Sequence, residues 1–211
     1  MKSSSVQQTW PEPPLDQSVR QRLLAGAARL FARKGYAAAS VRELVAAAGV
    51  TKPVLYYYFG SKEGLYLALM RSASDRFQAV LDEFSADRRP VWERIQSLVD
   101  TLFSMFLEEM DVARLLFAVY YGPPQGVPDF DFKAHHLGLV ELVRDMMKEG
   151  IEKRDLKPAD PLELTWAVLG PMHLTMHMYM SHPEKAPDRQ SLSRALNLVY
   201  RGLAVEKQCR G

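Results

Sequence analysis

The amino-acid sequence predicts an all-α protein in which a three-helix N-terminal domain is joined by one long helix to a larger helical domain. Two observations support this fold class. Apolar residues recur every three or four positions through most of the chain. Residues that favour helix ends, such as serine, aspartate and glycine, separate these runs. We expect a flexible arm at 1–14, a first domain at 15–62 and a second at 63–211.

The composition is that of an ordinary globular protein, with 211 residues, 47% hydrophobic and 25% charged. The longest apolar runs are too short to span a membrane, and the first residues lack the apolar stretch of a signal peptide. We therefore expect a cytoplasmic protein with no membrane partner. The single cysteine, Cys209, excludes an intrachain disulfide and a cysteine-based metal cluster.

Basic residues are concentrated at the N-terminal end of the chain. The first 72 residues contain 10 Lys and Arg against 4 Asp and Glu, a formal net charge of +6. The remaining residues carry −4, so the overall charge of +2 is an average over two unlike parts. A basic first domain suits a polyanionic partner.

Helix-capping residues mark the first two helices. Asp16 can cap a helix that ends at Gly35, where glycine is the usual C-terminal residue. Ser40 and Glu43 have the spacing of a capping box, in which each side chain bonds the other residue's backbone amide. The second, short helix begins there and ends at Gly49, which permits a sharp turn.

The third helix, Lys52 to Phe59, carries the first functional signal. Leu55 can face the core, which leaves Lys52, Tyr56 and Tyr57 pointing outward. Ammonium and phenol groups are suitable donors for phosphate oxygens. Two short helices joined by a glycine turn, the second with an outward basic and aromatic face, are typical of a helix-turn-helix. The alternative is a three-helix packing unit without a DNA-binding role.

Four stretches of the N-terminal domain form a recognisable pattern. They are Leu30 to Tyr36, Ser40 to Leu44, Ala48 to Lys52 and Leu55 to Leu65. In these stretches the domain resembles that of the TetR family of bacterial transcriptional regulators, and the resemblance runs from about Val19 to Leu69. The sequence departs from the family pattern at Pro53, often a glycine, and at Tyr58, often a histidine.

The resemblance implies specific contacts to double-stranded DNA. Lys52, Tyr56 and Tyr57 correspond to contacts of the recognition helix. Arg42 and Thr51 correspond to further phosphate or base contacts. The family pattern also assigns a phosphate anchor to Lys62, at the start of the next helix, where the positive helix N-terminus adds to the ammonium charge.

The second domain is predicted to be helical throughout. Its first helix, Lys62 to about Ser85, leaves the DNA-binding unit and enters the rest of the protein, so it can transmit motion between them. Further periodic runs begin at Val91, Val112 and Leu137, and two more close the chain.

The last two predicted helices carry apolar stripes. These stripes consist of Leu162, Leu169, Met176, Met180, Leu192, Leu196, Val199 and Leu203. Two such helices from each subunit can form a four-helix bundle across a two-fold axis. A dimer would place two recognition helices about 34 Å apart, the spacing needed to read a palindromic operator. Alternatively, both stripes face the core of their own subunit.

Aromatic and methionine side chains of the second domain predict a pocket for an apolar or aromatic small-molecule effector. The candidate lining residues are Phe103, Phe106, Phe117, Tyr120, Met147, Trp166 and His173, with methionines such as Met105, Met172 and Met176. His173 and His177 have a spacing that can hold a metal, but no third ligand lies nearby in the sequence, so we expect no metal site. The two histidines fit either the pocket or the dimer seam.

The favoured hypothesis is a homodimeric repressor that a small molecule releases from a palindromic operator. A regulator of the same fold that activates transcription, or that responds to no ligand, is the nearest alternative. A helical enzyme is disfavoured because the sequence has no recognisable nucleophile with its base, no phosphate loop and no metal motif. We expect no cofactor.

Overall fold

The computed structural model describes residues 17–121, 126–131 and 133–205. Regular structure in these ranges is helical, apart from one isolated bridge between Leu156 and Ala204. The helices are α1 (Gln17–Lys34), α2 (Val41–Ala48), α3 (Lys52–Phe59), α4 (Lys62–Ala86), α5 (Val91–Glu108), α6 (Met110–Tyr121), α7 (Lys133–Glu152), α8 (Pro161–Ser181), the short 3₁₀ helix η1 (Pro183–Lys185) and α9 (Arg189–Leu203). The predicted all-α fold is confirmed.

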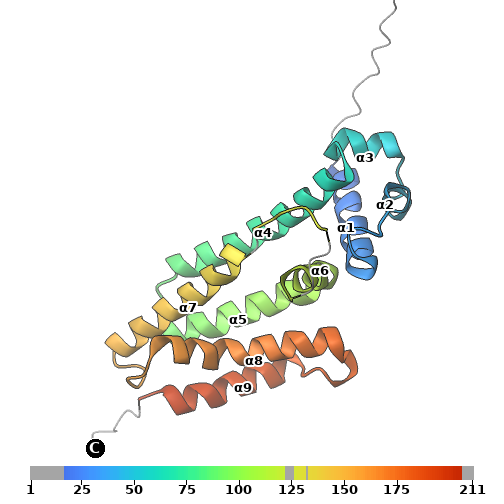
Figure 1. The fold of residues 1–211 in the computed structure, drawn as a ribbon. Coiled ribbons are helices and arrows are strands. Elements are labelled where there is room, and N and C mark those ends of the chain that lie inside the picture. Colours follow the sequence, from blue (N-terminus) through green and yellow to red (C-terminus); the bar gives the residue numbers. More distant parts are fainter. Residues whose placement is uncertain (1–16, 122–125, 132, 206–211) are drawn as a thin grey trace, which may run out of the picture.

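The helices form two parts connected by α4 (Figure 1). We call residues 17–70 the head and the rest of the chain the body. In the head, α1, α2 and α3 pack around the first half of α4, with a core that contains Phe31, Leu44, Leu55 and Tyr66. In the body, α5, α7, α8 and α9 pack together with the second half of α4. The long helix therefore begins in the core of the head and ends in the core of the body.

Capping interactions of the second helix follow the predicted pattern. The Ser40 hydroxyl accepts a hydrogen bond from the Glu43 amide at 3.3 Å, and the Glu43 carboxylate accepts one from the Ser40 amide at 3.0 Å. Gly49 ends α2 with a φ of 65°, in the left-handed region that glycine tolerates. Thr51 occupies the cap position of α3, but its side chain makes no capping hydrogen bond with the described residues.

Three sequence predictions fall outside the described residues. They concern the arm at 1–14, the helix cap at Asp16 and the cysteine Cys209. Among the described helices, none combines the length and the apolar content needed to cross a membrane.

The head contains an electrostatic contact that joins α1 to α2. The Lys34 ammonium, in the last turn of α1, bonds the carboxylate of Glu43. Together with the two hydrogen bonds from Ser40, this contact lowers the pKa of Glu43 to about 2. Because the ordinary value is 4.5, the carboxylate stays ionised well below the pH at which it would be protonated in the unfolded chain.

The substitution Glu43→Gln tests this contact. A lowered folded-state pKa contributes stability above pH 4.5 that is lost as the pH falls toward 2. We expect the variant to melt below the wild type at pH 7 and the gap to shrink between pH 4.5 and 3, as measured by circular dichroism. The exposed Glu152→Gln serves as a control and should show no such gap. A gap for Glu43→Gln that stays constant with pH would contradict the assignment.

Candidate functional site

The outer surface of α3 presents a lysine and two tyrosines to solvent. Leu55 is fully buried, which turns the opposite side of the helix outward. Tyr56 and Tyr57 are 48% and 40% exposed, and Lys52 is exposed beside them at the start of the helix. Because these exposed aromatic side chains are adjacent and lie beside a basic one, this face is a candidate contact surface.

The turn between α2 and α3 fixes the direction of this surface. The backbone amide of Val50 donates to the carbonyl of Val45 at 2.9 Å, directly after the left-handed Gly49. Two further residues near the turn are exposed, namely Thr51 before α3 and Arg42 in the first turn of α2. The arrangement is that of a helix-turn-helix with an uncovered second helix.

Lys62 is already engaged with the head. Its ammonium lies 4.2 Å from the centre of the Tyr36 ring and donates to the carbonyl oxygen of Ala37 at 3.3 Å. Burial lowers the pKa of Lys62. At Gly64, in the first turn of α4, an added Cβ would lie 1.9 Å from the carbonyl oxygen of Phe59, so glycine permits this close approach. Lys62 thus ties the start of α4 to the connection between α1 and α2.

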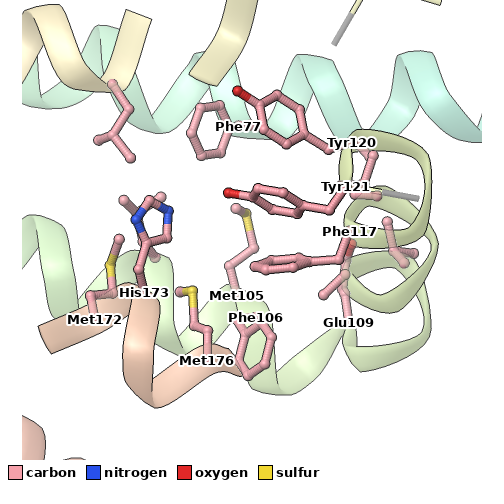
Figure 2. Close-up of a pocket in the computed structure, with 16 residues that line it drawn as sticks. Phe77, Met105, Phe106, Glu109, Phe117, Tyr120, Tyr121, Met172, His173 and Met176 are labelled. Carbon is pink, nitrogen blue, oxygen red and sulfur yellow. The ribbon is translucent and has the colours of Figure 1, made fainter. Parts of the chain in front are cut away.

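A pocket of about 140 Å³ lies in the body, between α4, α5, α6, α7 and α8. Its lining consists of Ala73, Phe77, Leu102, Met105, Phe106, Glu109, Val112, Ala113, Leu116, Phe117, Tyr120, Tyr121, Leu139, Met172, His173 and Met176. Figure 2 shows the rings of Phe77, Phe117, Tyr120 and Tyr121 on one side and His173 with Met172 on the other. Such an apolar, aromatic cavity suits a small organic ligand.

One carboxylate interrupts this apolar wall. Glu109, between α5 and α6, forms an ion pair with Arg76 of α4. Burial raises the pKa of the Glu109 carboxyl, Arg76 opposes that rise, and the neighbouring charge of Glu108 adds to it. A charged group in the wall of an otherwise apolar cavity is a candidate for ligand recognition.

Helix α6 belongs to both parts of the molecule. Leu115 is buried in the core of the head, with Val112, Leu116 and Val119 of the same helix packed against that core. The same helix supplies six of the pocket-lining residues, from Val112 to Tyr121. In Figure 1, α6 lies between α1 of the head and α5 of the body. A displacement of α6 by a ligand would therefore change the packing of the core of the head.

Comparisons with known proteins agree on one family. Residues 23–69 match the family model for bacterial regulatory proteins of the tetR family. The transcriptional repressor AcnR of Corynebacterium glutamicum is 28% identical over 184 residues, which cover 85% of this chain and 89% of AcnR. The chain belongs to the TetR family. Its function is therefore that of a DNA-binding transcriptional regulator.

Two further relatives of this TetR-family chain are informative. The transcriptional activator FasR of Mycolicibacterium smegmatis is 33% identical over 98 residues, 46% of this chain and 45% of FasR. SmeT, the repressor of the multidrug efflux pump SmeDEF of Stenotrophomonas maltophilia, has the same fold. Its structure superposes with a TM-score of 0.67 at 17% identity, over 89% of this chain and 91% of SmeT.

The pocket of this TetR-family protein contains some of the residues expected from its sequence. Phe106, Phe117, Tyr120 and His173 lie in its wall, as do the methionines Met105, Met172 and Met176. Three expected residues lie elsewhere. Phe103 and Met147 are fully buried in the core of the body, and Trp166 is 62% exposed on the outside of α8.

Several residues of the pocket wall were not anticipated, among them Phe77, Tyr121 and Glu109. Phe77 is one of several apolar residues on α4, and its sequence spacing does not show which of them faces the cavity. Tyr121 directly follows the expected Tyr120. Glu109 is a charged residue between two apolar runs, and this position was the one available signal that it lines the cavity.

The apolar stripes expected at a dimer seam pack inside the subunit. Leu169, Met176, Leu192 and Leu196 are buried in the body, and Met176 also lines the pocket. The other four predicted residues are partly buried, and of these Met180, Val199 and Leu203 pack against the body core while Leu162 lies in the first turn of α8. This arrangement corresponds to the alternative, in which the stripes face their own subunit.

The outer faces of α8 and α9 carry different apolar residues. Trp166 and Leu174 on α8 and Leu198 on α9 are 62%, 63% and 69% exposed. The two histidines of α8 lie on different faces of the helix, because His173 lines the pocket and His177 is exposed to solvent. The helices therefore have a second apolar face that the sequence stripes did not reveal.

Proposed function

We propose that this protein is a homodimeric, sequence-specific repressor that a small apolar or aromatic molecule releases from a palindromic operator. The observation that carries the proposal is the shared helix α6, which lines the pocket and completes the core of the head. Ligand binding can alter DNA binding only if the ligand prefers one of the two head positions. Helix α6 provides the contact through which such a preference can act.

The DNA-binding surface of the proposal is the exposed face of α3. Lys52, Tyr56 and Tyr57 would contact the major groove or its phosphates, with Arg42 and Thr51 beside them. Lys62 would bind a phosphate only by leaving the Tyr36 ring and the Ala37 carbonyl oxygen that it contacts in this structure. We therefore assign Lys62 first to positioning α4 and second to the phosphate.

Repression is favoured over activation by the extent of the similarity. AcnR, named a repressor, matches over most of both chains. FasR, named an activator, matches over less than half of either chain. Activation is therefore the second candidate function, and the proposal describes a regulator and not an enzyme.

The exposed face of α8 and α9 is the proposed dimer interface. Trp166 and Leu174 lie on the side of α8 that faces away from the body core, and Leu198 lies on the corresponding side of α9. Figure 1 shows these two helices together along one side of the body, opposite α4. Exposed aromatic and leucine side chains on adjacent helices are typical of a subunit interface.

The DNA-binding surface is tested by the variants Lys52→Ala and Tyr56→Ala. The probe is a duplex selected by the wild-type protein from a random pool, and binding is followed by fluorescence anisotropy at several salt concentrations. Loss of a base or phosphate contact should weaken binding about tenfold. The Lys52 variant should also lower the salt dependence, because fewer counterions are released.

Lys148→Ala, on α7 in the body, is the matched control and should bind DNA as the wild type does. Circular dichroism establishes that each variant is folded. Unchanged affinity for both head variants would contradict the assigned surface. A wild-type protein that selects no duplex would contradict the proposed function itself.

The dimer interface is tested by Leu174→Glu and Leu198→Glu. A buried carboxylate without a partner is costly, so we expect each variant to sediment as a monomer where the wild type sediments as a dimer. Leu137→Glu, which alters a similarly exposed leucine at the start of α7, should leave the dimer intact. Sedimentation equilibrium measures the change. Dimers in both interface variants would place the interface elsewhere.

A further inference from the structure

The charge pattern of the pocket wall indicates the kind of molecule that it selects. Among the lining residues that the structure describes, Glu109 is the one with a charged side chain. The others are apolar or aromatic, apart from the imidazole of His173. A carboxylate ligand placed in this cavity would meet another carboxylate and no lysine or arginine of the described wall. The wall thus disfavours anions.

The cation that balances Glu109 comes from outside the wall. Arg76 is not a lining residue, and its side chain is 47% exposed to solvent. Its guanidinium bonds Glu109 through the carboxylate oxygen Oε2. A carboxylate can accept hydrogen bonds from several donors. An exposed arginine loses little free energy when its ion pair breaks, because water then solvates the guanidinium. A cation that enters the pocket can therefore compete with Arg76 for Glu109.

Aromatic rings line the same cavity as this carboxylate. The ring centres of Phe117 and Tyr121 are 5.4 Å apart, and those of Tyr120 and Tyr121 are 4.6 Å apart. Figure 2 shows these three rings projecting from α6 into the cavity, with Phe77 close by. The electron-rich face of an aromatic ring attracts a positive charge, and the attraction grows as water is excluded.

We propose that the pocket selects a lipophilic cation, such as an aromatic or aliphatic amine or quaternary ammonium, whose charge replaces Arg76 at Glu109. The proposal rests on the proposed function, since it names the chemical class of the effector. The aromatic wall and the thioethers of Met105, Met172 and Met176 contact the apolar part of the ligand.

The same exchange gives the cation a means of acting on the head. The pair formed by Arg76 and Glu109 joins α4 to the junction of α5 and α6. A cation at Glu109 releases α4 from that junction. Because α4 and α6 both contribute to the core of the head, the release changes how the head is held on the body.

The test uses two ligands of the same shape. Phenyltrimethylammonium and tert-butylbenzene differ in a positively charged nitrogen in place of a neutral carbon. Equilibrium dialysis measures the affinity of each for the full-length protein. We expect the cation to bind the wild type about tenfold more tightly than its neutral counterpart, a ratio that a carboxylate and aromatic faces can supply.

Three variants locate the source of that preference. Glu109→Gln should lower the affinity for the cation about tenfold and leave that for tert-butylbenzene unchanged. Arg76→Gln should raise the affinity for the cation several-fold, because it removes the competing charge. Glu108→Gln, which removes the neighbouring exposed carboxylate outside the wall, is the matched control and should preserve the preference for the cation.

The proposal is overturned if the neutral ligand binds as tightly as the cation. It is also overturned if neither ligand binds at millimolar concentration, or if Glu109→Gln keeps the full preference. Binding that persists in Glu109→Gln for tert-butylbenzene shows that the pocket is still folded. DNA affinity in the absence of ligand is measured separately, so a failure of the cation preference leaves the proposed DNA-binding function standing.

Discussion

The arrangement of the molecule depends on the burial of one leucine of α6 in the head. Leu115 belongs to the core of the head, although it lies more than forty residues beyond residue 70, where the head ends, while neighbouring residues of α6 line the pocket. A packed core does not deform continuously, so a helix that is shared by two cores transmits a displacement instead of absorbing it. The head and the body therefore act as coupled parts, with α4 as their second connection.

Two electrostatic contacts hold the helices of the head together and do not involve the exposed side chains of α3. Glu43 joins α1 to α2 through Lys34, and Lys62 joins α4 to the Tyr36 ring, so both act behind the exposed face of α3. That face keeps its own lysine and two tyrosines open to solvent. In the body the situation is reversed, because the pair of Arg76 and Glu109 lies at the edge of the pocket, where a ligand can reach it.

Local chemistry made the helix ends predictable from the sequence, and tertiary packing made the sites harder to predict. The capping box of Ser40 and the turn at Gly49 involve neighbours in the chain, so their pattern suffices. On α8 the stripe through Leu169 and the opposite face with Trp166 are both apolar, and spacing alone does not show which one the body buries. The role of Leu115 depends on α1, which lies far away in the sequence.

The most direct measurement is hydrogen exchange of the α1 amides in Leu115→Ala, compared with Leu98→Ala in the core of the body. Both leucines are buried, so each truncation leaves a cavity of similar kind. If α6 completes the core of the head, exchange in α1 rises by at least about tenfold in Leu115→Ala and rises less in Leu98→Ala. Exchange in α1 that is unchanged in Leu115→Ala, or that responds more strongly to Leu98→Ala, would contradict the account.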